Sequence, residues 1–299
     1  MNDKSLRNKA VILTLLITIF WSLSFIASSQ LVNNNVSSEA LVFTRFIIGA
    51  FCLFIVNFKH IIKIAKIDII GGIVIGLCIL WAMYFQNLSY LTTSVSKVAF
   101  ISSMSICLVP FLAFIINKSI IKKRHIIGLV LAIISVSFLT LNFNDLSHIN
   151  IGDFFAFLCA FGFAMQVVTL KSFSSKANAM NLIFVHALVV SIGGLIICLF
   201  NHSNITIAFN KDNILSLLYL SIVCMAFCYS IQAWASKYIS EVLASILIST
   251  QAIFGSMFDI IIFHTHITLQ FIIGALIMIM SLFVLLAPNK YLFFLSKQE

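Results

Sequence analysis

The chain has 299 residues, of which 62% are hydrophobic and only 9% are charged, and it carries a formal net charge of +9. Its mean hydropathy of +1.14 lies far above the values of soluble globular proteins, which excludes a soluble enzyme or binding domain of ordinary composition. One bilayer crossing takes about 20 apolar residues, so ten crossings would use roughly two thirds of the chain. The composition therefore predicts a polytopic membrane protein that works within or at the bilayer.

Ten apolar stretches follow one another along the chain, separated by short polar gaps. Pro110 lies inside the fourth of them, and because a proline removes one backbone donor we expect a kink there. Pro288 follows the last stretch, at a place where helices commonly stop. The predicted membrane-spanning helices cover residues 10–30, 40–58, 67–88, 95–117, 125–142, 152–171, 179–200, 214–234, 242–263 and 268–287.

Lysine and arginine residues gather in every second gap between these helices. Of the 18 basic residues, 15 lie in such places, and only Arg45, Lys97 and Lys211 lie in the others. Because basic loops stay in the cytoplasm during insertion, the pattern predicts a cytoplasmic-membrane protein with both termini on the cytoplasmic side. The charges form small clusters beside helices, which is typical of topology signals, so we expect no nucleic acid partner.

The second half of the chain repeats features of the first half. Since each half holds five helices, an odd number, the second half must enter the membrane from the opposite side. We therefore expect two inverted repeats, at residues 10–142 and 152–287, an architecture typical of alternating-access transporters. A shift of 142 residues pairs Trp21 with Phe163 and Ser24 with Gln166, and a shift of 146 pairs Gly128 with Gly274, Ser135 with Ser281, Gln86 with Gln232, Ser103 with Ser249 and Ser105 with Gln251.

Several short motifs resemble one family of carriers. The first helix contains Ile19-Phe-Trp-Ser-Leu-Ser-Phe25, the second contains Arg45-Phe46, and the fourth contains Pro110-Phe-Leu-Ala-Phe114. In these motifs, and over nearly its whole length, the chain resembles the ten-helix EamA-like branch of the drug/metabolite transporter superfamily. The resemblance implies an all-helical membrane fold and transport of a small organic metabolite, with export favoured. The chain departs from the family at Gln251-Ala252, where the family has Glu-Pro.

Polar and aromatic side chains near the middle of the helices form the candidate substrate site, because such groups rarely face lipid. Aromatic faces combined with neutral donors and acceptors suit an amphipathic or zwitterionic small molecule, for example an amino acid. In the alternative interpretation the serine hydroxyls bond to carbonyls of their own helices and Trp21 only packs. The predicted substrate-binding residues are Trp21, Ser103, Ser105, Phe163, His186, Ser249 and Gln251.

Two further groups of residues are candidates for gating and for charge pairing. Gln86 and Tyr90 on the third helix and Tyr229 and Gln232 on the eighth form related polar stripes. We expect them to act as gates, with Gln86 near the outer mouth and its repeat partner Gln232 near the inner one. Interfacial solvation of these side chains is the alternative.

Asp259 is an acid well inside the ninth helix, and an ionised side chain at this depth should have a partner. We expect it to pair with Arg45 or Lys97 and to close the outer face, and proton coupling through Asp259 is the alternative reading.

These features predict a secondary carrier for a small organic metabolite rather than an enzyme. Its expected partners are the substrate, the lipid bilayer and, for coupling, a proton or a counter-substrate, in a monomer or a homodimer. The seven cysteines lie in apolar stretches without metal-binding spacing, so we expect no cofactor and no metal. The rival classes are a channel, a non-transporting scaffold, and a membrane enzyme in which His148 and Asp153 form an acyltransferase-like His-x4-Asp motif.

Overall fold

The computed structural model describes residues 3–61, 63–93, 95–140, 150–263 and 268–286, and in these ranges every regular element is a helix. A helix satisfies its backbone hydrogen bonds within one segment, as the apolar interior of a bilayer demands. The first half contains α1 (Asp3–Asn33), α2 (Ser38–Ile61), α3 (Lys66–Ser89), α4 (Val95–Ser103), α5 (Ser105–Asn117) and α6 (Lys123–Thr140). The second half contains α7 (Ile151–Ser174), α8 (Ala179–Phe200), the 3₁₀-helix η2 (Ile205–Phe209), α9 (Lys211–Leu218), the π-helix η3 (Tyr219–Cys228), α10 (Tyr229–Ala235), α11 (Glu241–Ser249), α12 (Gln251–Phe263) and α13 (Leu269–Leu286).

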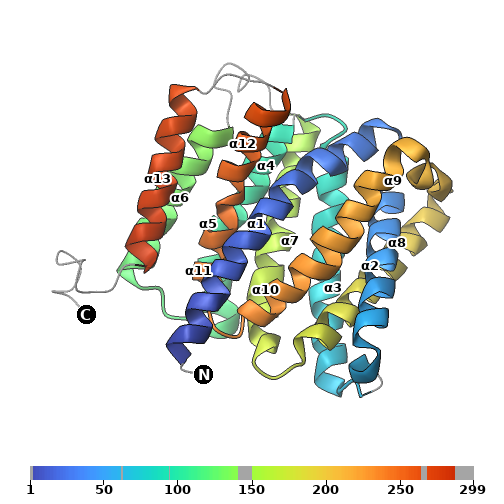
Figure 1. The fold of residues 1–299 in the computed structure, drawn as a ribbon, viewed down its shortest axis with the longest axis horizontal. Helices are drawn as coiled ribbons and strands as arrows, with labels where there is room; N and C mark the ends of the chain where they lie inside the picture. Colours follow the sequence, from blue (N-terminus) through green and yellow to red (C-terminus); the bar gives the residue numbers. More distant parts are fainter. Residues whose placement is uncertain (1–2, 62, 94, 141–149, 264–267, 287–299) are drawn as a thin grey trace.

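The predicted spans are all represented by helices (Figure 1). The fourth span is α4 followed by α5, the eighth is the continuous run of α9, η3 and α10, and the ninth is α11 followed by α12. Eight stretches of the described chain are long and apolar enough to cross a bilayer. The fifth and ninth predicted spans, α6 and α11–α12, are the helices outside that set. The protein is thus an all-α, multi-pass membrane protein.

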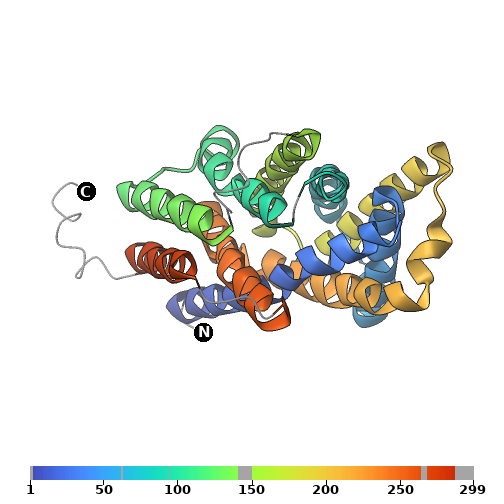
Figure 2. The ribbon, with the colours of Figure 1, turned by 90° about the horizontal axis from the view of Figure 1, so that it is seen from above.

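The helices form two rows when the molecule is seen from above (Figure 2). Contacts run along one row from α6 through α5, α7 and α3 to α8, and along the other from α13 through α12, α1 and η3 to α2. Each row contains helices from both halves of the chain. The two halves are therefore interleaved rather than separate, and any cavity between the rows is built from both.

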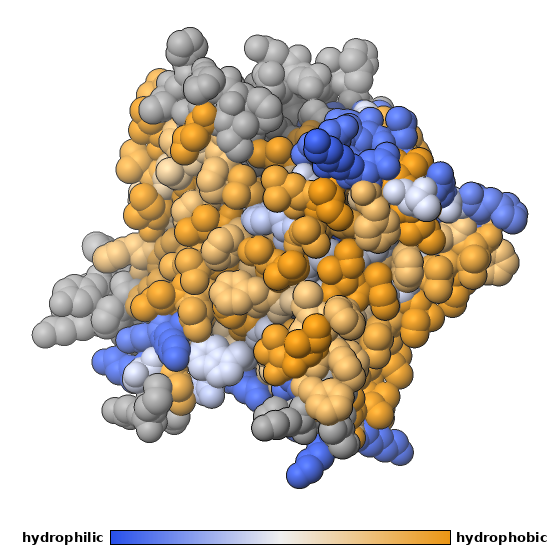
Figure 3. Space-filling model, turned by 45° about the vertical axis from the view of Figure 1, so that its right-hand side comes forward, coloured by the Kyte–Doolittle hydropathy of each residue, from blue (hydrophilic) through white to orange (hydrophobic). Residues whose placement is uncertain are grey.

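The outer surface of the molecule is apolar. Large side chains such as Phe51, Phe111, Leu215 and Ile279 are exposed, and hydrophobic residues cover most of the face in Figure 3, with hydrophilic residues toward its upper and lower ends. An apolar surface of this extent is unfavourable in water and suits contact with lipid tails. The surface agrees with the multi-pass prediction made from composition.

The basic clusters lie at one end of the bundle. Arg7 of α1, Arg124 of α6 and Leu285 of α13 line one small cavity together with Tyr238, so α1 begins at the end where α13 finishes. Lys171, near the end of α7, donates to the backbone carbonyls of Ser236 and Ile239 at 2.8 and 2.9 Å. The ends that the charge pattern assigned to one membrane side are therefore together in the fold.

Contacts between α6 and α13 are reciprocal, as a two-fold axis between the halves requires. The Ser135 hydroxyl donates to the Gly274 carbonyl, and the Ser281 hydroxyl donates to the Gly128 carbonyl, both at 2.7 Å. Both hydroxyl–carbonyl pairs connect positions that are related by the shift of 146 residues (128 to 274 and 135 to 281). Close packing at the two glycines brings the helices near enough for these bonds. The fold consists of two inverted five-helix repeats.

Both repeats break their fourth helix at the same position. Met104 separates α4 from α5 with φ −63° and ψ −10°, and Thr250, 146 residues later, separates α11 from α12 with φ −62° and ψ −13°. Each break is a tight turn in which a backbone N–H donates to the carbonyl three residues earlier. The N–H of Met104 donates to Ile101 (3.0 Å), and the N–H of Thr250 donates to Leu247 (3.2 Å). The break in the fourth predicted span is at Met104, six residues before Pro110. Pro110 lies within α5, and the same break occurs in the second repeat, where Ser256 takes its place.

Candidate functional site

A cavity of about 70 Å³ lies between the repeats. Of its sixteen lining residues, fourteen form seven repeat-related pairs, and the exceptions are Arg45 and Ser245. Secondary transporters that are built from inverted repeats bind their substrates in a cavity between the two repeats. The pairs are Trp21 with Phe163, Ser24 with Gln166, and Phe25 with Val167, each 142 residues apart, and Met83 with Tyr229, Gln86 with Gln232, Ser102 with Ile248, and Ser105 with Gln251, each 146 residues apart.

The broken helices contribute to the cavity directly. Ser105 and Gln251, the residues immediately after the breaks at Met104 and Thr250, both line it. Turns in the middle of a membrane helix free backbone polar groups from the regular helical pattern, and they are tolerated where they face protein or a cavity. The breaks therefore place both side-chain and backbone polarity beside the cavity.

Four of the predicted substrate-binding residues line the cavity: Trp21, Ser105, Phe163 and Gln251. The position of Trp21 is fixed by a hydrogen bond, because its indole N–H donates to the backbone carbonyl of Cys224 in η3 at 3.1 Å. This bond connects α1 of the first repeat to the run of α9, η3 and α10 in the second repeat. The Trp21 ring also packs against the Tyr229 ring, with centroids 5.3 Å apart.

The other predicted substrate-binding residues, Ser103, Ser249 and His186, lie outside the cavity wall. The Ser249 hydroxyl donates to the Ile246 carbonyl of its own helix at 2.8 Å, which is the alternative that the sequence left open. His186 is fully buried, and neither of its ring nitrogens has a hydrogen-bond partner within the described residues. It packs edge-on behind Tyr229, with ring centroids 5.2 Å apart.

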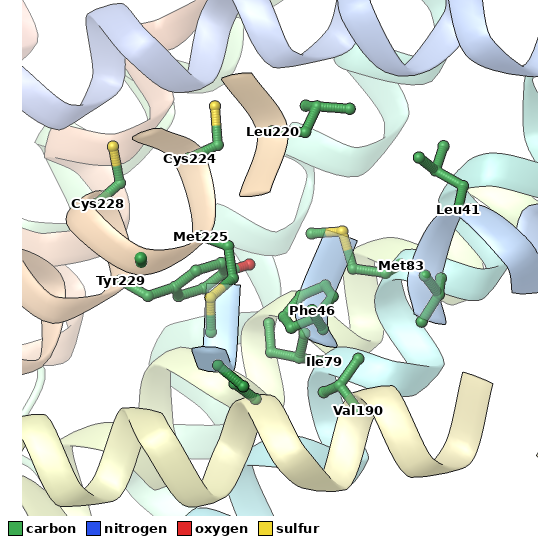
Figure 4. Packing of buried hydrophobic residues seen from close by; sticks show 14 of the residues in the cluster. Leu41, Phe46, Ile79, Met83, Val190, Leu220, Cys224, Met225, Cys228 and Tyr229 are labelled. Carbon is green, nitrogen blue, oxygen red and sulfur yellow. The ribbon is translucent and has the colours of Figure 1, made fainter. Parts of the chain in front are cut away.

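Phe46 completes this group of rings. Its centroid lies 5.6 Å from that of His186 and 6.4 Å from that of Tyr229. Figure 4 shows Phe46 and Tyr229 in one apolar cluster with Met225 and Ile79. His186 therefore supports the cavity wall from behind and does not form part of it.

Three of the four predicted gate residues, Gln86, Tyr229 and Gln232, line the same cavity. Tyr90 does not, and its hydroxyl is buried without a hydrogen-bond partner in the described part of the chain. The Gln232 side chain accepts a hydrogen bond at 3.0 Å from Gln166 of α7. Gln232 also lines a smaller cavity of about 10 Å³, together with Lys171 and Glu241 near the basic end of the bundle. The Gln166–Gln232 pair thus lies between the central cavity and that end.

One residue of the predicted charge group, Lys97, has an acidic partner among the described residues. Lys97 of α4 forms an ion pair with Asp153 of α7, with Nζ and Oδ2 3.0 Å apart. The other oxygen of Asp153 accepts a hydrogen bond from Thr93, also at 3.0 Å. The acid bound to Lys97 thus comes from the start of the second repeat, whereas the side chain of Asp259 lies outside the described residues.

Several cavity residues were missed as site residues, although a signal for some was present. Gln166 had been matched to Ser24 by the repeat shift, yet neither was expected to bind substrate. Applying the shift of 142 residues to every neighbour of Trp21 would have found Phe25 and Val167 as well. Ser245 has Ala99 at the corresponding position of the first repeat, so no comparison of the halves indicates its place.

Comparisons with known proteins agree with this architecture. The sequence model of the EamA-like transporter family matches residues 8–141 and again residues 150–287. An uncharacterized transporter of Archaeoglobus fulgidus is 23% identical over 269 residues, which are 90% of this chain and 83% of that protein. A crystal structure with 11% sequence identity superposes with a TM-score of 0.79, covering 95% of this chain and 99% of its own. That crystal structure shows a shared fold.

Proposed function

The chain belongs to the EamA-like transporter family, and from that premise we propose that it is a secondary carrier for small amphipathic organic metabolites, amino acids included. It transports them across the cytoplasmic membrane by alternating access, as repeats that we place at residues 10–142 and 152–287 rock against each other. Export is the proposed direction, in line with the resemblance to drug/metabolite transporters. The driving force is either a proton gradient or exchange for a counter-substrate.

The single observation that carries this proposal is the paired lining of the central cavity. Seven pairs of lining residues are related by the repeat shifts, so each half contributes a nearly equivalent wall. When two equivalent walls enclose one site, an arrangement open to one side of the membrane has a counterpart open to the other. A rigid scaffold would have no need for such a cavity.

We propose that the two ends of the cavity close in different ways. At one end the ion pair of Lys97 and Asp153 links the two repeats. Toward the basic end, which we assign to the cytoplasm from the charge pattern, the Gln166–Gln232 pair separates the central cavity from the smaller one. Opening each end would break the corresponding contact, so both are candidate gates.

The contacts of Asp153 argue against the enzyme alternative. Its carboxylate pairs with Lys97, accepts from Thr93, and accepts from the backbone N–H of Asn150 at 3.2 Å in the cap of α7. Such a carboxylate is held in a structural role and is poorly placed to orient a catalytic histidine. His148, the other member of the His-x4-Asp motif, lies outside the described residues.

Counterflow in proteoliposomes tests the proposed function. Purified protein would be reconstituted with a mixture of small metabolites inside, and uptake of each labelled metabolite would be followed with and without a pH gradient. A carrier gives saturable uptake that is accelerated by substrate on the other side. Unsaturable flux without acceleration would indicate a channel, and the absence of any protein-dependent flux would contradict transport. A response to the pH gradient that Asp259→Asn removes would assign proton coupling to Asp259.

A further inference from the structure

One charged side chain in the cavity has no charged partner among the described residues. Arg45 of α2 lines the cavity and is only 3% exposed. Its guanidinium donates from Nη1 to the Met83 sulfur at 3.6 Å and lies 5.7 Å from the centre of the Phe46 ring. Its Nε has no hydrogen-bond partner in the described ranges of the chain. Sulfur and an aromatic ring are weak partners for a guanidinium that is always charged.

Four acids of the described helices have partners outside the cavity. Asp68 accepts from Asn181, Asp153 pairs with Lys97, Glu241 accepts from Ser119, and Glu39 accepts from Asn201. No acid is among the lining residues of the cavity in the part of the chain that the structure describes. An uncompensated buried charge is costly, so a group of opposite charge beside Arg45 would stabilise it. An anion in the cavity would supply that group.

Arg45 also breaks the symmetry of the cavity. It lies eight residues after Ser37, which precedes α2, and the residue eight positions after Asn178, which caps α8, is His186. His186 is buried behind the cavity wall. The cavity thus has a single positive end on the α2 side and no counterpart on the α8 side. A ligand with one charged end fits this arrangement better than a symmetrical one.

We propose that the cavity selects organic monoanions, namely carboxylates with an apolar or aromatic body, and that Arg45 binds the carboxylate. This inference rests on the proposed function and names the substrate class of the same site. A guanidinium fits a carboxylate with two parallel hydrogen bonds. The rings of Trp21, Phe163 and Tyr229 supply the apolar surface for the rest of the molecule. The neutral amides of Gln86 and Gln251 add polar contacts without adding charge.

The charge balance favours a monoanion over the alternatives. A monoanion neutralises the one positive charge of the cavity. A zwitterionic amino acid would bring an ammonium group that finds no carboxylate among the lining residues, and a dianion would need a second cation. Amino acids are therefore expected to bind more weakly than the corresponding acids without the amino group.

The test is a binding measurement on the full chain in detergent or nanodiscs, which needs no transport. The probes are hexanoate, phenylacetate and indole-3-acetate, each compared with its neutral amide, and phenylalanine as the zwitterion. A charge-assisted contact of this kind corresponds to roughly tenfold to hundredfold in affinity. We expect at least one carboxylate to bind about tenfold or more tightly than its amide, and phenylacetate to bind more tightly than phenylalanine.

Two variants and one control assign the preference to Arg45. Arg45→Gln should abolish the preference for carboxylate over amide while leaving amide binding within about twofold, and Arg45→Lys should retain part of it. Arg7→Gln removes the same charge from an exposed position near the end of the bundle and should change nothing. Thermal melting would confirm that each variant is folded, and if Arg45→Gln is not, Arg45→Lys and the wild-type comparison still decide.

The proposal is overturned if no carboxylate binds more tightly than its amide at millimolar concentration, or if Arg45→Gln keeps the preference. If carboxylates bind with this preference but no flux appears in proteoliposomes, the proposed transport fails and the assignment of the site stands. If flux of neutral or cationic metabolites appears without carboxylate preference, transport stands and the monoanion assignment fails.

Discussion

The two repeats share the backbone geometry of their broken fourth helices, but they differ in the side chain that the second helix of each repeat carries near the cavity. Met104 and Thr250 break the fourth helices with φ and ψ angles that differ by only a few degrees, and α6 and α13 exchange equivalent hydrogen bonds. In contrast, α2 presents Arg45 to the cavity, whereas α8 buries His186 behind it. In the proposed mechanism the shared backbone would allow two equivalent conformations, and the unmatched Arg45 would set the orientation of the substrate.

The largest expected effect comes from the aromatic pair Trp21 and Phe163. Trp21→Ala should lower transport more than tenfold and reduce thermal stability, because it removes a large buried ring and the bond to the Cys224 carbonyl. Phe163→Ala should have a smaller effect on both, since no hydrogen bond ties Phe163 to the opposite repeat. Transport assays and thermal melting measure the difference, and Trp21→Phe separates loss of the bond from loss of the ring. Equal effects of the two alanine variants would show that the indole contact is unimportant.

The next largest effect concerns the equivalent glycines where α6 packs against α13. A Cβ atom added at Gly128 would lie 2.8 Å from the Leu285 side chain, and one added at Gly274 would lie 2.8 Å from the Leu139 side chain. Gly128→Ala and Gly274→Ala should therefore lower the free energy of unfolding by similar amounts, about 1–2 kcal/mol.

Gly255→Ala is the matched control, because the added Cβ would meet only the Ser22 Cβ at 3.9 Å. Thermal melting of the three variants should show two similar decreases and one unchanged midpoint. A decrease confined to one of the paired glycines would argue against equivalent packing in the two repeats.

A smaller effect concerns the glutamines of the third helical runs. Gln232→Leu should slow transport several-fold, because it leaves Gln166 unpaired at the boundary between the two cavities. Gln86→Leu should also slow transport if Gln86 acts as the corresponding gate of the first repeat. Initial rates in proteoliposomes measure both variants, and unchanged rates in both would remove the gate hypothesis.

The smallest effect is expected at the serines next to the helix breaks. Ser103→Ala and Ser249→Ala should change transport less than twofold, because both side chains lie outside the cavity. Ser105→Ala, in which the substituted residue lines the cavity, is the positive control and should have a larger effect on the apparent affinity. A large affinity change in Ser249→Ala would mean that the cavity of another conformation includes this residue.

The sequence was sufficient for the architecture because hydropathy and the placement of basic residues report directly on insertion into a bilayer. The repeat shift also identified Trp21, Phe163, Ser105 and Gln251, since symmetry places equivalent residues around one axis. It could not identify the breaks at Met104 and Thr250, because these tight turns carry neither proline nor glycine and depend on packing.

The sequence also did not predict that Lys97 forms an ion pair with Asp153. Asp259 was expected to pair with Arg45 or Lys97, and its side chain lies outside the described residues. Lys97 forms an ion pair with Asp153, 56 residues away along the chain. Depth in the membrane alone does not indicate which helices are neighbours, and the contact between α4 and α7 follows from interleaving of the repeats. Side-chain direction, which decides that Ser105 lines the cavity and Ser103 does not, depends on the intervening break.

Alternating exposure of the central cavity is the claim that most needs a direct test. In a variant without the seven native cysteines, Ser105→Cys and Gln251→Cys would be labelled with a membrane-impermeant thiol reagent added to either side of oriented vesicles. The account predicts that both positions react from both sides, and that a transported compound shifts the balance between the two. Reaction of each position from one side only, unchanged by any such compound, would contradict it.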